Sequence, residues 1–210
     1  MKTCFSTLGL LAGVMVLAAF IAVSPSQAAI ITDQYAKTLD ITDWVDTGVE
    51  INQFDPILGT LTQVDVVLSG NILSSIYIDN DNPTAELIKG TIESELTVSG
   101  FNGLSDFFIG LTTNSGYQLF DPDDSGDTDF PGDGGGDEGL FTGLTGANSS
   151  TLTFTSDLSS WIGTGTLGAT MFTVTGFGAM GGGGNADLDV NNQAGGLLSV
   201  TYTYNPSGAP

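Results

Sequence analysis

The sequence has very little positive charge. It contains three basic residues (Lys2, Lys37 and Lys89) against 24 acidic ones, and its formal net charge is −21. Binding to nucleic acid requires clustered Lys and Arg side chains that neutralise phosphates, and adhesion to anionic lipid requires basic patches. The composition therefore excludes both classes of partner.

Histidine is absent, and Cys4 is the single cysteine. Ser–His or Cys–His nucleophile pairs and imidazole or thiolate zinc sites cannot be built from what remains. A carboxylate-only glycoside hydrolase needs two acids across a cleft, and Glu50, Glu93 and Glu95 are nominal candidates. Glu93 and Glu95 lie two apart in an alternating segment, which predicts a wet outer face instead. We therefore expect no enzyme.

The N-terminus has the pattern of a secretory signal peptide. Lys2 precedes an apolar run over residues 8–23, and the small residues Ser26 and Ala28 follow. The apolar run is shorter than the ~20 residues that span a bilayer, and the small residues favour cleavage after Ala28. We expect residues 1–28 to be removed, leaving a secreted or cell-surface chain with neither a thiol nor a membrane span.

The rest of the sequence alternates between apolar and polar residues. The clearest case runs from Ile88 to Val98, where apolar side chains alternate with Lys89, Glu93 and Glu95. This period of two is typical of a sheet with one buried face. Further strands are expected over residues 60–68, 72–78, 107–111, 151–155, 167–175 and 197–204.

Turn-forming residues separate these segments, and one short helical turn is expected. The turns lie at 69–71, 79–83, 99–100, 114–116 and 181–184, and the helical turn at 157–161. Short strands at such spacing indicate a sandwich or barrel. The sequence therefore predicts one all-β domain over residues 29–210, a single antiparallel β-sandwich of the jelly-roll or immunoglobulin-like type.

Three segments carry a family resemblance. Residues 51–61 read INQFDPILGTL, and residues 153–165 (TFTSDLSSWIGTG) precede a closing GGLLSVTYTY at 195–204. In this order they resemble the choice-of-anchor E domain of exported bacterial proteins, over about residues 35–204. The resemblance implies an exported domain of the kind often followed by a PEP-CTERM sorting segment, and it brings no catalytic residues. The sequence ends without such an apolar anchor, so we expect free secretion or retention through a partner.

An acidic, glycine-rich loop is expected over residues 121–139. With Asp121 as its first position, Asp123 is third, Ser125 fifth and Gly126 sixth, which matches the order of a calcium-binding EF-hand loop. The twelfth position is glycine, so the match is incomplete. A Ca²⁺ site and a solvated acidic loop both remain open. The candidate ligands are Asp121, Asp123, Ser125, Asp127, Asp129 and Asp133.

Two smaller acidic groups are expected to be ordinary turns or strand ends. One contains Asp79, Asp81 and Glu86, and the other contains Asp187 and Asp189 after the glycine run. We expect each of these two groups to contribute little to a cation site.

These features favour a secreted, non-catalytic matrix, surface or adhesion protein, stabilised by Ca²⁺ if the loop binds it. The first alternative is a carbohydrate-binding module with Trp44, Trp161, Tyr77 and Tyr117 as stacking rings, although aromatic residues in strands usually fill the core. The carboxylate-dependent glycoside hydrolase is the second alternative. The expected partners are extracellular polysaccharide or further copies of the chain, added at a sheet edge.

Overall fold

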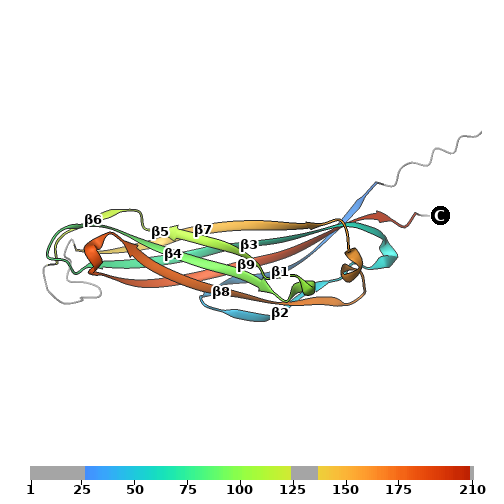
Figure 1. Ribbon diagram of the computed structural model, residues 1–210, viewed down its shortest axis with the longest axis horizontal. Coiled ribbons are helices and arrows are strands. Elements are labelled where there is room, and N and C mark those ends of the chain that lie inside the picture. Colours follow the sequence, from blue (N-terminus) through green and yellow to red (C-terminus); the bar gives the residue numbers. More distant parts are fainter. Residues whose placement is uncertain (1–26, 124–136, 209–210) are drawn as a thin grey trace, which may run out of the picture.

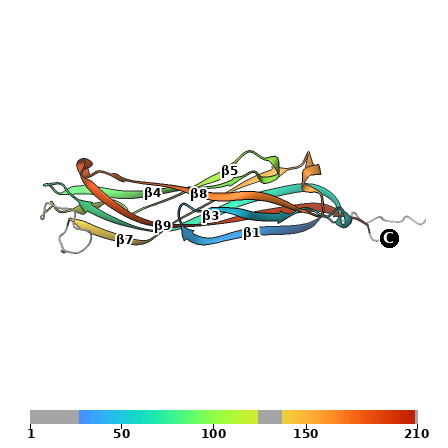
Figure 2. The same ribbon diagram turned by 90° about the horizontal axis from the view of Figure 1, so that it is seen from below.

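The computed structural model describes residues 27–123 and 137–208, which form two antiparallel sheets packed face to face (Figures 1 and 2). The all-β sandwich expected from the sequence is confirmed. The strands are β1 (Ala29–Ile41), β2 (Val45–Asn52), β3 (Gly59–Asn80), β4 (Glu86–Ser99), β5 (Phe107–Asn114), β6 (Gln118–Phe120), β7 (Glu138–Phe154), β8 (Thr166–Met180) and β9 (Ala186–Pro206).

Short 3₁₀ turns link several strands. They are η1 (Pro56–Leu58), η2 (Phe101–Gly103), η3 (Leu158–Trp161) and η4 (Gly182–Gly184). The helical turn expected near residue 157 is therefore present, as η3. Within the described parts of the chain, no helix is long and apolar enough to cross a membrane.

The strand order is β1-β9-β3-β7 in the first sheet and β2-β8-β4-β5 in the second, where β6 adds to β4. The pairing is nested: β1 pairs with β9, β2 with β8, β3 with β7 and β4 with β5. The chain therefore folds back on itself as one long antiparallel ribbon that is divided between two layers.

Strand β3 is the longest strand of the first sheet, and it pairs with β9 on one side and with β7 on the other. Its 22 residues span about 70 Å at the rise of an extended strand. Gly59 lies opposite Pro206 at one end of the molecule, and Asp79 lies opposite Asp187 at the other. The result is a rod whose described chain begins and ends at the same end (Figure 1).

The prediction of a turn at residues 69–71 is wrong, because these residues continue β3. Gly70 faces Gly196 on β9, and a Cβ atom added to either glycine would lie 2.7 or 2.8 Å from Cδ2 of Leu96. Leu96 belongs to the opposite sheet and is fully buried. These glycines therefore let a leucine from the facing sheet approach the backbone.

Other boundaries also differ from those expected. Glu138 and Gly139, assigned to the acidic loop, begin β7. The sequence patterns indicated neither β1 nor β2, and they indicated only parts of β7 and β9. Residues 99–100, 114–116 and 181–184 do lie where strands end, as expected.

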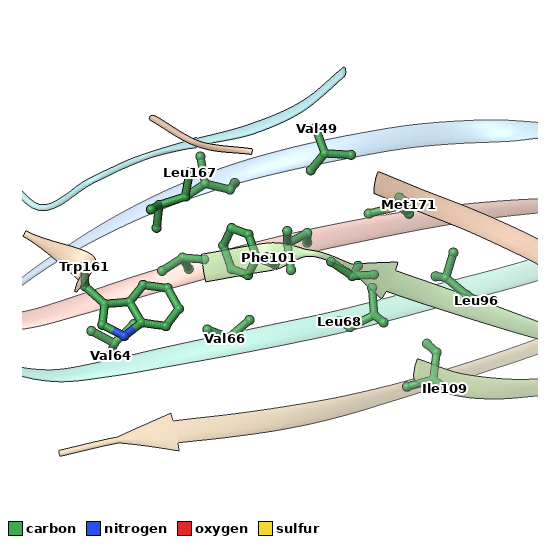
Figure 3. Packing of buried hydrophobic residues seen from close by; sticks show 14 of the residues in the cluster. Val49, Val64, Val66, Leu68, Leu96, Phe101, Ile109, Trp161, Leu167 and Met171 are labelled. Carbon is green, nitrogen blue, oxygen red and sulfur yellow. The ribbon is translucent and has the colours of Figure 1, made fainter. Parts of the chain in front are cut away.

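The core consists of two apolar clusters between the sheets. The larger contains Val64, Val66 and Leu68 of β3, packed with Phe101 and Trp161 (Figure 3). The smaller lies toward the other end of the rod and contains Ile76, Ile78, Ile88, Ile92 and Phe120.

A buried polar network crosses between the sheets beside these clusters. The Asn192 amide of β9 donates to Ser94 Oγ of β4 at 2.8 Å and accepts from Ser74 Oγ of β3 at 2.5 Å. Ser94 also hydrogen-bonds Thr175 Oγ1 at 2.8 Å. Buried polar groups destabilise a fold unless they are hydrogen-bonded. Because these side chains bond one another only in this arrangement, the network fixes how the two sheets align.

The three segments that carry the family resemblance meet at the end of the rod where the described chain begins and ends. The Phe54 amide donates to the Trp161 carbonyl at 2.9 Å, and the Gly163 amide donates to the Phe54 carbonyl at 3.0 Å. The Phe54 ring centroid lies 5.1 Å from that of Tyr204. Asp55 caps η1 by accepting from the Ile57 amide at 2.9 Å. The motif residues therefore build the closed end of the sandwich.

Replacing Gly70 with alanine tests the close approach of Leu96. We expect Gly70→Ala to lower the free energy of unfolding by about 1–3 kcal/mol, since it overpacks the core. Gly176→Ala is the matched control, because a Cβ atom on that strand glycine has nothing within 4 Å. Chemical denaturation measures both variants. Adding Leu96→Val should recover part of the loss in Gly70→Ala, and equal stability of the two glycine variants would contradict the packing account.

Candidate functional site at the acidic end

The end of the rod opposite Gly59 and Pro206 collects acidic residues from separate segments. Strand register places Asp79 of β3 between Glu138 of β7 and Asp187 of β9. Residues directly opposite one another in adjacent strands share a face of the sheet, with Cβ atoms about 4.5–5.5 Å apart. Three acids thus lie in one row across three neighbouring strands.

Hydrogen bonds from Asn80 and Asn82 hold the surrounding segments together. The fully buried Asn80 donates from its side chain to the Asp121 carbonyl at 2.7 Å and from its backbone to the Asp137 carbonyl at 3.0 Å. The Asn82 carbonyl accepts from the Asp123 amide at 2.8 Å. The turn after β3 therefore brings both ends of the acidic segment to the same place.

The segment that follows η4 joins the same arrangement. The Asp81 amide donates to the Asn185 carbonyl at 3.0 Å, and Asn82 Nδ2 donates to the Gly182 carbonyl at 2.6 Å. The glycine run thus brings Asp187, at the start of β9, toward the turn after β3.

Burial and mutual repulsion raise the pKa of two of these carboxyl groups. Asp79 is only 6% exposed, and desolvation, followed by the charges of Asp81, Asp137, Glu138 and Asp123, raises its pKa to about 6. Desolvation, with the charges of Asp187 and Asp123, also raises the pKa of Asp81. Both shifts mean that the folded state disfavours the ionised form.

The two lysines of the described chain are engaged elsewhere. Lys37 forms an ion pair with Asp40 at 3.0 Å, and the Lys89 ammonium lies 5.1 Å from the ring centroid of Tyr117. Asp137 is also only 6% exposed, and its buried Oδ1 atom has no hydrogen-bond partner among residues 27–123 and 137–208. The described chain thus has no spare cationic side chain for this end.

The calcium ligands expected from the sequence fall partly within this region. Asp121 and Asp123 lie beside the turn after β3. Ser125, Asp127, Asp129 and Asp133 lie outside the described residues, so that part of the expectation stays a prediction. In residues 27–123 and 137–208, no group of three or more acids is already gathered at metal-ligand spacing.

Sequence reasoning treated Asp79, Asp187 and the acidic loop as three separate features, whereas the structure brings them to one end of the rod. It also missed the burial of Asp79 and Asp137. The sequence assigned Asp79 to a turn over residues 79–83, whereas β3 continues through Asp79 and Asn80. Nothing in the sequence pattern indicates that Asp79 is buried there. Only the long-range register between β3, β7 and β9 reveals the row of acids.

The aromatic residues considered for sugar stacking are mostly in the interior. Trp44, Trp161 and Tyr77 are 7%, 2% and 8% exposed, which confirms the expectation that they fill the core. Tyr117 differs, since it is 51% exposed and lies beside Lys89. The two tryptophans therefore offer no free ring face to a carbohydrate.

The acids considered for glycoside hydrolysis lie on the surface. Glu50, Glu93 and Glu95 are exposed, and the last two share the outer face of β4 as the alternation predicted. Glu93 and Glu95 line an open groove of 420 Å³ together with Val174 and Gly176 of β8. A larger groove of 440 Å³ lies between the end of β1 and strands β8 and β9.

Comparisons with known proteins name no family for this chain. No family model and no curated protein matches it. A match among solved structures is described as "Structure of infectious bursal disease virus Gx strain", with 10% sequence identity and a TM-score of 0.21. That match covers 95% of this chain, which spans 42% of the viral chain. A likeness of this degree carries no argument about fold or function.

The raised pKa of Asp79 predicts that acidification stabilises the protein when divalent cations are absent. A carboxyl whose folded pKa is about 6 binds its proton more tightly than the unfolded chain, so stability falls as pH rises through that value. Between pH 7.5 and pH 5 we expect Asp79 to contribute a gain of about 1 kcal/mol in the free energy of unfolding. Urea denaturation in EDTA at both pH values measures this gain.

Asp79→Asn should be more stable than the wild type at pH 7.5 and should lose this share of the pH dependence. Asp106→Asn removes one exposed charge near the start of β5, at a distance from the acidic end, and serves as the control. Asp106→Asn should keep the pH dependence of the wild type. If Asp79→Asn kept it as well, the assignment to Asp79 would be wrong.

Proposed function

We propose that this chain is an exported, non-catalytic β-sandwich that acts as a structural or adhesive module of an extracellular matrix or cell surface. The signal-peptide pattern of residues 1–28 and the resemblance to choice-of-anchor E domains support export. The lack of histidine, and of any cysteine after residue 4, leaves few chemical means of catalysis and supports a binding or structural role.

The rod-like shape with two different ends is the observation that carries this proposal. The described chain begins and ends at the end closed by Phe54 and Tyr204, and the acids around Asp79 lie at the opposite end (Figure 1). An attachment made near Ala29 or Pro206 would leave the acidic end facing away from the attachment point. Such geometry suits a spacer or adhesive module that presents one end to its surroundings.

Within the sandwich class, we infer a jelly roll rather than an immunoglobulin-like fold. The nested pairs β1–β9, β2–β8, β3–β7 and β4–β5 are what results when one long antiparallel ribbon is rolled into two sheets. Jelly rolls of eight strands arise in this way from two Greek keys. Strand β6 is a short addition beside β4.

Among the expected partners, the sheet edges favour another copy of the chain. Strand β1 is a 13-residue edge of the first sheet, and Ile30, Ile31 and Ile41 on it are exposed. On the opposite side, Asn148 of β7 donates to the Gly110 carbonyl of β5 at 2.9 Å and so links the two sheets. A long edge with exposed apolar residues can pair with a strand of another chain.

Fractionation of the source cells tests export directly. An epitope tag placed at the C-terminus should be recovered in the medium or on the cell surface, and N-terminal analysis of the recovered protein should begin at Ala29. Replacing Ala28 with a large residue such as phenylalanine should block cleavage, because signal peptidases require small residues there. Recovery of an intact chain from the cytoplasm would refute the proposal.

A further inference from the structure

We infer that the second half of β8, residues 173–180, is a docking edge for an extended, basic segment of another protein. The segment would add to the sheet as a further strand at the point where β2 stops. This edge differs from β1, the edge at which the proposed module would pair with another copy of the chain. The inference concerns the described sandwich and does not depend on export.

Both sheets lose their outer strand at the same level of the rod. Strand β2 pairs with β8 only over residues 166–172, and β8 continues beyond it toward the acidic end (Figure 1). Beside it, the Thr42 amide after β1 donates to the Asn192 carbonyl of β9 at 3.1 Å, and the pairing of β1 with β9 goes no further. Among the described residues, this side of the sandwich is therefore open along its acidic half.

The backbone of β8 directs hydrogen-bonding groups toward this open side. The Thr173 amide donates to the Trp44 carbonyl at 3.1 Å, just before the start of β2. Alternate residues of an antiparallel strand direct their N–H and C=O groups to the same neighbour. Because the register of β8 with β4 is unbroken here, Thr175, Phe177 and Ala179 direct theirs the same way. No strand of the described chain pairs with these three residues on that side.

Side chains between the sheets are also incompletely covered at this opening. At inward positions of β8, Met171 and Thr173 are 0% and 1% exposed, whereas Phe177 is 60% exposed. Val190 of β9 is only partly buried against the smaller apolar cluster. Phe177 and Val190 both line the groove of 440 Å³ between β8 and β9. An added strand would therefore bury apolar side chains in addition to pairing its backbone.

The open part of β8 has none of the features that usually protect an edge strand. Such edges are protected by charged side chains, proline or bulges. Residues 173–180 read TVTGFGAM, without charge or proline, and their register with β4 contains no bulge. The open part of β9, in contrast, carries Asp187 and Asp189. A further strand is therefore expected to pair with β8.

The charges around the groove select a basic partner. The exposed carboxylates of Asp43 and Asp189 line it, and neither lysine of the described chain does. A second copy would bring 24 acidic residues against three basic ones to this place, and like charges would repel. A segment that combines apolar residues with Lys or Arg can cover Phe177 and also offset both charges.

Fluorescence anisotropy with a labelled peptide tests the edge on the chain from residue 29. The probe is an eight-residue peptide that alternates lysine and valine, and we expect it to bind at least tenfold more tightly than its glutamate–valine counterpart. Ala179→Pro should weaken binding at least fivefold, since it removes an N–H group from the open side. Ala179→Ser keeps this group and should stay within twofold of the wild type.

The variants at position 179 carry the same charge, so they separate strand addition from general attraction to an acidic protein. Equal affinity of the lysine–valine peptide for both variants would overturn the inference, as would no binding at millimolar peptide. Both variants should melt within about 3 °C of each other, because proline is tolerated on an edge strand whose N–H faces solvent.

Hydrogen exchange locates the bound peptide in the wild type without relying on a substitution. The amides of Thr175, Phe177 and Ala179 should exchange freely in the unbound chain and become protected in the complex, whereas those of β1 should not change. Protection on β1 alone would place the peptide elsewhere and overturn the inference.

Sedimentation without peptide tests the competing occupant, a second copy. A dimer that Ala179→Pro dissociates would mean that another copy occupies this edge, and it would overturn the choice of a basic partner. A dimer that this variant leaves intact agrees with pairing at β1 and leaves the β8 edge free for the peptide.

Discussion

The register of β3 with its two neighbours is the constraint on which the rest of the structure depends. This strand is paired with β9 from Gly59 to Asn80 and with β7 from Val64 to Asp79. A slip of one residue would exchange its buried and exposed faces, so the apolar residues at even positions from Val64 to Ile78 fix the pairing strongly. This register therefore determines which residues lie next to one another at both ends of the rod.

The two ends show opposite consequences of that constraint. At one end, the register closes Gly59 against Pro206, and the rings of Phe54, Tyr202 and Tyr204 pack together. At the other end, the same strands place acids opposite one another. Apolar burial stabilises the first end throughout. At the second end, the smaller apolar cluster around Ile78 and Ile88 and the hydrogen bonds of Asn80 and Asn82 act against the repulsion between the acids.

Much of the fold could be predicted from the sequence, and the errors have physical causes. Period-two alternation identified β4 because one of its faces is buried and the other is wet. Gly70 was mistaken for a turn because its role, making room for Leu96 of the other sheet, depends on a contact across the sandwich. Strand β1 was missed because an edge strand with many exposed residues has no clean alternation. The candidate site was harder to predict, because it arises from the pairing of Asp79 with Glu138 and Asp187, which lie 59 and 108 positions later in the sequence.

Net charge alone does not indicate which acids of this chain affect its stability. Exposed acids such as Glu93, Glu95 and Asp106 are solvated and need no counter-ion. Asp79 and Asp137 differ, because the fold removes them from water and leaves them beside other carboxylates. For Asp79, burial and the neighbouring charges disfavour the ionised form and raise its pKa. Both lysines of the described chain are engaged elsewhere, and the pKa of Asp79 lies near 6. At neutral pH the buried charge of Asp79 therefore lowers the stability of this end, and the exposed acids have no such effect.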